Sequence, residues 1–421
     1  MERCLWRFCL SLLSTAAGVL AQSATPQHAL SWQETQAIFR ANNPTLSAGR
    51  LNIDESRADE ITAYLRPNPN LNFGWDQLTP FSSSPYRPIA QSYLYGSMDY
   101  LHERQHKREL RLRSAQGATT IAISTQRDLE RNLMFNLRDA FVRVLLAKAV
   151  LGVARANLDY YDKQIDINKI RFNAGGIARV DFERVEIQRV QFESDVQTST
   201  VNLRTAKIDL LALLRDLTPV EQFEVNEPFN FAEPVSTLPD LRRLALETRP
   251  DLREAQQSLV KARTDHQLAV ANGSTDPIFG VNGSHQPPPL NTYVGLSLSI
   301  PLRVFDRNQG EKQRTLIDIN RNERLLNQTE VTALHDIDSA YATLESTLTL
   351  LRPYKAKYLQ EADDIRATVS YAYERGAASL LDFLDAEKQY RDTQLNYLNL
   401  VGAYFSAVNQ VNFSVGREVI R

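Results

Sequence analysis

The sequence is poor in the residues that build small catalytic and metal sites. Its 421 residues include only two cysteines, Cys4 and Cys9, and six histidines. It contains no G-x-S-x-G motif, no phosphate-binding loop and no convergent set of His and Asp. Charge of one sign is not in excess either, since 48 basic and 50 acidic residues give a net charge of −2. The sequence therefore predicts a protein that is not an enzyme, needs no cofactor and has no nucleic-acid partner.

Long apolar runs are scarce as well. Beyond residue 21, no run approaches the roughly 18 residues that a membrane-spanning helix needs. The one apolar run, 8–20, follows Arg3 and Arg7 and ends in small residues at Ala21. Residues 1–21 are therefore predicted to be a signal peptide of a bacterial envelope protein. Its cleavage would remove both cysteines and so exclude disulfides, and neither cysteine lies where a lipid could be attached. If the mature chain crosses a membrane, it must do so as strands in a closed barrel.

Proline and glycine are nearly absent from four long stretches. Apolar residues recur there at helical spacing, as in Leu133, Leu137 and Phe141, which predicts long helices. A helix of about 70 residues would be roughly 100 Å long, a length that suits a protein crossing a wide space. The four stretches are 101–172, 178–217, 311–375 (broken only by Pro353) and 377–401.

The chain contains an internal repeat. The segment "RFNAGGIARVDFERVEIQ" around Gly175 aligns with "AYERGAASLLDFLDAEKQ" around Gly376 at a constant offset of 201 residues. Both lie between two predicted helices, and glycine permits the backbone conformation of a sharp reversal. Six pairs in register indicate a duplicated unit. The pairs are Phe172 with Tyr373, Gly175 with Gly376, Asp181 with Asp382, Phe182 with Phe383, Glu186 with Glu387 and Gln188 with Gln389.

Each half also contains segments of period two. Apolar and polar residues alternate in 68–78 and 292–302, which predicts strands with one apolar face. The neighbouring segments 91–100 and 277–284 show the same pattern more weakly, and Pro-rich loops at 79–90 and 284–291 separate each pair. Four strands of about ten residues could cross a membrane at a tilt, but they cannot close by themselves, so a membrane location requires an oligomer. The alternative is a soluble helical protein with two hairpins.

These patterns predict a mainly α protein with a small β part, built from two tandem repeats of long antiparallel helices. The first repeat, 22–217, comprises a helix, strands 68–78 and 91–100, a long helix 101–172, a tip turn 173–178 and a helix 178–217. A linker, 218–240, follows. The second repeat, 241–415, comprises a helix, strands 277–284 and 292–302, a long helix 308–375, a tip turn 375–379 and a helix 380–412. Residues 416–421 form a C-terminal tail.

This plan resembles the TolC-type outer-membrane efflux channel family over residues 25–415. The segments that carry the resemblance are "YERGAASLLDFLDAE" (373–387) and "FNAGGIARVDFERVE" (172–186), which look like the family's periplasmic tip turns. The resemblance implies a homotrimer in the bacterial outer membrane, in contact with its lipid. Its strands form a twelve-stranded β-barrel, and its helices pack as coiled coils into an α-barrel through the periplasm.

The resemblance also implies partners and a function. The expected partners are a periplasmic adaptor (membrane fusion) protein and an inner-membrane pump, expected to be proton-driven, and the expected function is a passive exit conduit of a tripartite efflux system. The segment "HKRELRLRSA" (106–115) is similar to a helix start in the heavy-metal cation efflux branch, through Lys107, Arg108, Arg111 and Ala115. The exit duct of a type I protein secretion system and a periplasmic coiled-coil scaffold are the alternatives.

The resemblance further identifies candidate site residues. By motif position, Asp382 and Asp385 resemble the family's narrow periplasmic mouth, and their i,i+3 spacing puts both on one helix face. Three copies would gather six carboxylates and favour cations. The alternative is that they are N-terminal helix residues interacting with the macrodipole. Ala378 stands where the family has an arginine, although Arg375 is nearby. The residues expected at the tip turns for adaptor docking are Gly175, Gly376, Asp181, Tyr373 and Arg375.

One motif points to another function. His102-Glu103-x-x-His106 is the pattern of a zinc metalloprotease helix, and it is expected at the first turn of the long helix 101–172. Charged and polar neighbours such as Arg104 and Lys107 would crowd a dication, and no third ligand is indicated. The corresponding segment of the second half, 302–309, contains no histidine. We therefore interpret the match as accidental and predict no metal site.

Overall fold

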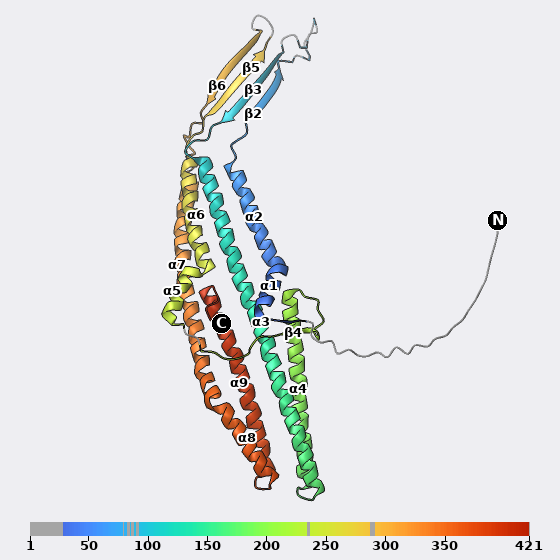
Figure 1. Ribbon diagram of the computed structural model, residues 1–421. Helices are drawn as coiled ribbons and strands as arrows, with labels where there is room; N and C mark the ends of the chain where they lie inside the picture. The colour runs from blue at the N-terminus through green and yellow to red at the C-terminus, as the bar shows by residue number, and fades with distance from the viewer. Residues whose placement is uncertain are drawn as a thin grey trace, which may run out of the picture.

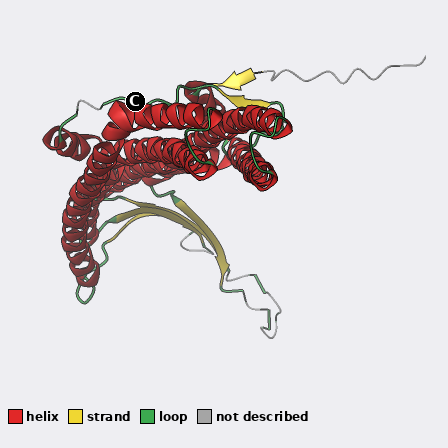
Figure 2. Ribbon diagram, turned by 90° about the horizontal axis from the view of Figure 1, so that it is seen from below, coloured by secondary structure: helices red, strands yellow, loops and turns green. Residues whose placement is uncertain are grey.

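The computed structural model describes residues 28–78, 80–81, 85, 88–89, 92–233, 236–286 and 291–420. The predicted signal peptide, 1–21, lies outside the described residues, as do parts of the predicted loops 79–90 and 284–291. A small sheet lies at one end of an elongated molecule, and two helix-to-helix turns lie at the other end (Figure 1). Viewed along the long axis, the helices form a curved layer (Figure 2).

The two halves of the chain contain the same order of main elements. The first half contains β1 (His28–Leu30), α1 (Trp32–Asn42), α2 (Pro44–Tyr64), β2 (Asn70–Asp76), β3 (Tyr93–Leu101), α3 (Lys107–Asn173) and α4 (Arg179–Leu214). The second half contains β4 (Phe223–Val225), α5 (Leu238–Thr248), α6 (Pro250–Asn272), β5 (Ile278–His285), β6 (Thr292–Ser299), α7 (Gln309–Pro353), a π-helical turn (Tyr354–Tyr358), α8 (Leu359–Glu374) and α9 (Leu380–Val415). The predicted fold class, mainly α with a small β part, is confirmed.

Two long helices differ from their predicted bounds. The helix predicted over 101–172 begins only at Lys107, because Gln105 and His106 adopt left-handed backbone angles, φ 57° and 55°, in the turn after β3. The helix predicted over 308–375 is interrupted after Pro353 by the π-helical turn. Proline has no backbone N–H and cannot donate the i→i−4 hydrogen bond, so the regular series of α-helical hydrogen bonds is interrupted there.

The segment 218–240, predicted to be an aperiodic linker, contains secondary structure. Strand β4 within it pairs in parallel with β1, aligning His28 with Phe223 and Leu30 with Val225. Helix α5 also begins inside it, at Leu238. Three-residue strands show no readable period, and the partner of β4 lies far away in the sequence. Both features depend on contacts that only the folded chain creates.

The main sheet joins the two repeats in the order β2-β3-β5-β6, with every neighbouring pair antiparallel. The register stacks apolar residues on one face, as in the row formed by Leu71, Met98, Val281 and Leu296. The other face is polar, and Asn72 Nδ2 there donates to Ser97 Oγ at 3.3 Å and to Asp99 Oδ2 at 3.2 Å. The apolar face is exposed in this chain. It comprises Leu71, Phe73, Trp75, Leu94, Met98, Phe279, Val281, Val294, Leu296 and Leu298.

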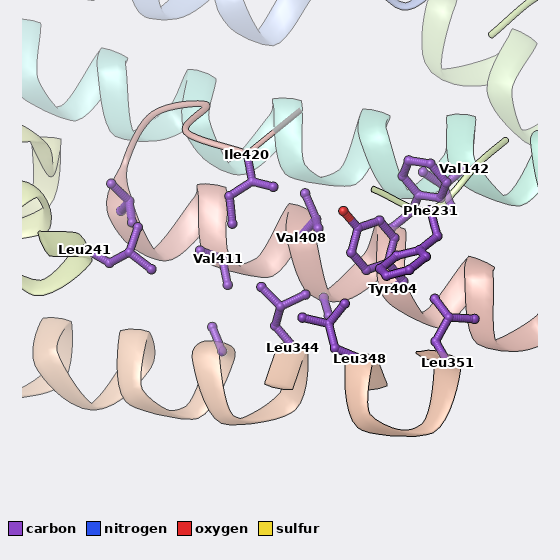
Figure 3. Packing of buried hydrophobic residues seen from close by; sticks show 14 of the residues in the cluster. Val142, Phe231, Leu241, Leu344, Leu348, Leu351, Tyr404, Val408, Val411 and Ile420 are labelled. Atoms are coloured by element: carbon purple, nitrogen blue, oxygen red, sulfur yellow. The ribbon is translucent and has the colours of Figure 1, made fainter. Parts of the chain in front are cut away.

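The helices bury their apolar stripes in three clusters. One gathers β1, α1, β4 and parts of α3 and α4, and a second gathers α5, α7, α9 and the chain end. In the second cluster, Leu344 and Leu348 of α7 face Val408 and Val411 of α9 (Figure 3). No helix in the described ranges has an apolar stretch long enough to span a membrane.

A buried arginine connects three helices in the middle of the molecule. Arg249, 3% exposed, lies between α5 and α6. Its guanidinium donates to Asp251 Oδ2 at 2.6 Å, to Asp336 Oδ2 of α7 at 3.0 Å and to the Ser414 carbonyl of α9 at 3.2 Å. A buried cation is tolerated because each of these acceptors replaces water. Arg249 therefore fixes the joint between α5, α6, α7 and α9.

We expect Arg249→Met to lower the free energy of unfolding by about 2–3 kcal/mol, because it leaves two carboxylates and a carbonyl without their donor. The measurement is the urea midpoint of the helical circular dichroism signal. Arg253→Met is the matched control, since Arg253 is exposed and its guanidinium donates only to the Glu247 carbonyl among the described residues. Equal midpoints for the two variants would contradict the assignment.

Candidate functional site

The two tip turns share one backbone geometry. In the first, Gly175 N donates to the Phe172 carbonyl at 2.9 Å and Gly176 N to the Arg171 carbonyl at 2.7 Å. In the second, Gly376 N donates to Tyr373 at 3.0 Å and Ala377 N to Ala372 at 2.8 Å. This pair of bonds is the Schellman motif, which needs a left-handed residue after the helix. Gly175 and Gly376 supply it, both with φ 75°.

The aromatic residues matched by the repeat lie face to face in both tips. Phe172 stacks on Phe182 with centroids 5.3 Å apart, and Tyr373 stacks on Phe383 at 4.9 Å. The second pair is buried in the third apolar cluster, together with Tyr161, Val185 and Phe192 from α3 and α4. Each stacked pair connects the helix that enters the turn to the helix that leaves it.

A hydrogen bond and a cation–π contact join the two tips. Tyr373 OH of α8 donates to Asn168 Oδ1 of α3 at 2.8 Å in a buried position. The Arg171 guanidinium of α3 lies 4.8 Å from the centre of the Tyr373 ring. Burial raises the pKa of Tyr373, so its hydroxyl stays a proton donor. Tyr373 therefore belongs to the packing between the tips. Arg375, in contrast, is exposed, with its guanidinium 4.5 Å from the centre of the Tyr371 ring.

The helices that leave the two turns begin differently. Ser379 and Asp382 form a capping box at the start of α9, in which Asp382 Oδ2 accepts from Ser379 N at 3.0 Å and from Ser379 Oγ at 2.7 Å. These hydrogen bonds lower the pKa of Asp382 and keep it anionic. At the start of α4, Ala178 provides no side-chain cap, and Asp181 lies 3.7 Å from Arg184. Asp382 therefore lies in the first turn of α9, as the macrodipole alternative expected, and it also takes part in a capping box that was not predicted from the sequence.

Capping does not hide the two candidate mouth residues. Asp382 and Asp385 are exposed one helical turn apart, while Phe383, Ala386 and Glu387 between and beside them are buried. Asp385 accepts only one side-chain hydrogen bond in the described structure, from Gln389 Nε2 at 2.7 Å. Both carboxylates thus lie on a face of α9 that this chain leaves uncovered.

A buried acid lies one turn beyond the mouth residues. Glu387 is 5% exposed, and its Oε1 has no hydrogen-bond partner among the described residues. Burial raises its pKa to about 7, against the opposing effects of Arg366 of α8 and the Tyr160 hydroxyl of α3. The Arg366 guanidinium lies over the rings of Tyr160 and Tyr390, 4.3 and 3.6 Å from their centres, and pairs with Asp363. Sequence reasoning noted Glu387 only as a repeat match. Glu387 lies in the apolar stripe of α9 formed by Phe383, Ala386 and Tyr390, and this position in the sequence could have predicted its burial.

The zinc-protease pattern does not lie on a helix. His102, Glu103 and His106 precede α3 in the turn described above, so the two histidines do not share a helix face. Glu103 forms a salt bridge with Arg111. No cluster of His, Cys, Asp or Glu in the described part of the chain could hold a metal ion.

The basic residues that follow this pattern have structural partners. Lys107, 4% exposed, binds Asp276 at 2.5 Å and the Ser274 carbonyl at 3.0 Å, and thereby joins α3 to the end of α6. Arg108 lies 4.2 Å from the ring of Tyr64, and Arg111 donates to carbonyls at the end of α2. These contacts tie the first turn of α3 to both neighbouring helices just below the sheet.

Comparison with known proteins gives the same result as the geometry. Residues 241–417 match the family described as outer membrane efflux protein. The chain is 23% identical over 403 residues to the cobalt-zinc-cadmium resistance protein CzcC of Cupriavidus metallidurans, covering 92% of this chain and 90% of that protein.

Solved structures share the fold. The structure of CusC, a protein that undergoes conformational changes on folding and transmembrane channel formation, matches with a TM-score of 0.75 and 18% identity over 91% of this chain and 92% of that one. The outer membrane protein VceC of Vibrio cholerae matches with a TM-score of 0.73 and 16% identity over 92% and 96%. The fold described above, a sheet at one end of a curved layer of long helices, is thus shared with these solved structures. The family resemblance inferred from the tip segments is confirmed, since residues 241–417 match the outer membrane efflux protein family and CzcC is similar over most of both chains.

Stability should fall with rising pH because of Glu387. Its pKa is about 7 in the folded chain and near 4.5 when exposed, so the folded chain binds more protons between these values. We expect the free energy of unfolding to fall by an amount on the order of 3 kcal/mol between pH 4.5 and pH 8, with no further fall from Glu387 at higher pH.

Glu387→Gln should remove this pH dependence, as measured by urea unfolding at pH 5 and pH 8. The matched control is Glu186→Gln, which changes the exposed repeat counterpart on α4 and should keep the slope. The same pH dependence in the Glu387→Gln variant as in the wild type would refute the assignment.

Proposed function

We propose that the protein is the outer-membrane channel subunit of a tripartite efflux system, a passive conduit and not an enzyme. The observation that carries the proposal is the exposed apolar face of the four-stranded sheet, at one end of helices about 100 Å long. An apolar sheet face of this kind suits the lipid of the outer membrane, and helices of this length suit the periplasm. The energy for export comes from a partner.

The proposed assembly is a homotrimer. Strands β2 and β6 each have one neighbour in the described sheet, so both edges present unpaired backbone groups. In lipid such edges must be paired, and pairing β6 of one copy with β2 of the next would close twelve strands from three copies. The curved helical layer beneath the sheet would close into the periplasmic α-barrel in the same way (Figure 2).

The tip turns are the proposed docking site for a periplasmic adaptor, which connects the channel to a proton-driven inner-membrane pump. Exposed apolar side chains surround both glycines, namely Ile170, Val180, Tyr371 and Leu381. Asp181 and Arg375 add charge beside them. Apolar side chains among polar ones at the far end of a long helical body are typical of a protein contact surface.

The proposed cargo is a metal cation. CzcC, which aligns over 90% of its length, is named a cobalt-zinc-cadmium resistance protein. Three copies of the exposed pair Asp382 and Asp385 around one axis would make a cation-selective mouth. A type I secretion duct would share the conduit but would not need carboxylates at its narrowest point.

Replacing Gly376 by valine tests the function of the tip. A β-branched residue at φ 75° is strained, so the Schellman turn should be lost while the sheet is untouched. In a strain lacking the native gene, the wild type should lower cell-associated zinc, and the Gly376→Val variant should leave it near the gene-deleted level. Heat-modifiable trimers should remain in the outer membrane.

Gly152→Val is the control, because Gly152 lies within α3 and has no positive φ, and a Cβ added there would meet no atom of the described chain within 4 Å. Zinc export by the Gly376→Val variant equal to that of the control would refute tip docking. Failure of the wild type to reach the outer membrane would refute the channel itself.

Neutralising the mouth tests cation selection. Asparagine keeps the oxygen that accepts from Ser379, so Asp382→Asn with Asp385→Asn removes charge without removing the cap. We expect single-channel cation preference to fall several-fold and block by trivalent cations to weaken at least tenfold. Asp364→Asn is the control, because this exposed aspartate of α8 also accepts from a glutamine, at 2.9 Å. Unchanged selectivity and block in the double variant would show that the two residues face away from the lumen.

A further inference from the structure

A cavity of about 400 Å³ lies in the middle of the helical layer, far from the tip turns. Its walls come from α1, α3, α9, the junction of α5 and α6, and residues 416–420 at the chain end. The distance from Phe135 in this cavity to Gly175 is about 60 Å along α3. The chain end, which forms one wall of the cavity, lies on the convex side of the layer (Figure 2), whereas the proposed conduit lies on the concave side.

The apolar part of the cavity has a fixed shape. Aromatic rings of Trp32, Phe135 and Phe413 line it, and the last two are 4.8 Å apart. The chain end forms one wall, because Asn412 Oδ1 accepts from the backbone N of Val419 and Ile420 at 2.8 and 3.0 Å. Ile420 thereby packs over Val408 (Figure 3). The site is preformed, as ligand pockets usually are.

The charged part of the cavity is not neutralised. Five of its lining residues are arginines, namely Arg40, Arg127, Arg131, Arg138 and Arg417. Two of them are paired: Arg40 with Glu130 at 2.7 Å, and Arg131 with Asp128 at 2.6 Å. The other three form no ion pair within the described ranges, and the one further acid of the lining, Glu418, is exposed and also unpaired there. An excess of positive charge remains.

Arg138 combines the apolar and charged features. Its guanidinium lies 4.5 Å from the centre of the Trp32 ring, and its buried Nη1 has no hydrogen-bond acceptor in the described structure. Burial lowers the pKa of Arg138, and Glu418 and Glu227 act in the opposite direction. A buried hydrogen-bond donor without an acceptor is unfavourable. A guanidinium that stacks on an aromatic ring can still donate two parallel hydrogen bonds to an oxyanion.

We propose that this cavity binds a small amphipathic anion, with its carboxylate on Arg138 and its apolar body against Trp32, Phe135 and Phe413. The carboxylate accepts from the Arg138 guanidinium, and charge-assisted bidentate bonds to arginine are among the strongest available. The apolar body displaces water from the aromatic walls. The ligand binds on the outer side of the helical layer, so it is not the cargo of the conduit.

Trp32 itself can report the binding. The chain has three tryptophans, and of the other two Trp6 lies in the predicted signal peptide and Trp75 lies in β2. In a Trp75→Phe background, the mature full chain in lipid nanodiscs therefore emits from Trp32 alone. Titration with octanoate should change this emission saturably, with an apparent Kd at least tenfold lower than for octylammonium or octanol. An equal response to all three probes, or no saturable response to octanoate, would overturn the proposal.

Variants locate the head group. Arg138→Gln should weaken octanoate binding at least tenfold and leave the response to octanol unchanged. Arg143→Gln is the control, because Arg143 is 68% exposed, pairs with Asp139 within α3 and lies outside the cavity. If Arg138→Gln does not fold, the double variant Arg127→Gln with Arg417→Gln changes two exposed rim residues and should weaken octanoate binding several-fold. Wild-type affinity in the folded Arg138→Gln chain, or in this double variant, would overturn the proposal.

Discussion

The apolar seam of α3 is the interaction on which the rest of the chain depends. Most of the stability of a helix in a protein comes from the packing of its apolar face, so the 67 residues of α3 need partners along their whole length. It packs against α2 and α6 near the sheet and against α4 and α9 toward the tips. Leu137 and Phe141 enter the cluster of the first repeat, while Val142 enters that of the second. The same helix therefore joins the two repeats and aligns the sheet with the tip turns.

Duplication has preserved the backbone of the tips and changed their side chains. Both turns keep the glycine at φ 75°, the Schellman bonds and a stacked aromatic pair, because these close the reversal. The capping box, an acid at the position of Asp385 (where the first turn has Arg184) and a buried glutamate occur only in the second turn. A turn needs only its backbone geometry, so the chemistry on its surface was free to diverge. The residues with a proposed role in selectivity are accordingly confined to α9.

Four buried charges in the described part of the chain show two kinds of environment. Lys107 and Arg249 are fully paired, and each holds together helices that meet at a joint. Glu387 and Arg138 each keep a buried polar atom without a partner among the described residues. Pairing offsets the cost of burial and gives a rigid joint, whereas an unpaired group responds to protons or to a ligand. The first group explains how the body is held together, and the second marks the places where it can respond.

Much of this molecule could be predicted from its sequence, because the signals are local. Helical spacing without Gly or Pro predicted the long helices, alternation predicted the strands, and the repeat around Gly175 and Gly376 located both turns. The paired strands β1 and β4 could not be predicted, since three residues have no period. Sequence spacing also put Asp382 and Asp385 on one face without showing that Asp382 caps α9.

The partners of Glu387 and Arg138 come from helices that are distant in the sequence, as do the walls of the arginine-lined cavity. The sequence by itself thus determined which segments are helices, strands and turns, through periodicity and backbone preference. The tertiary structure alone decided which charges are buried without a partner, because burial is a property of several helices packed together.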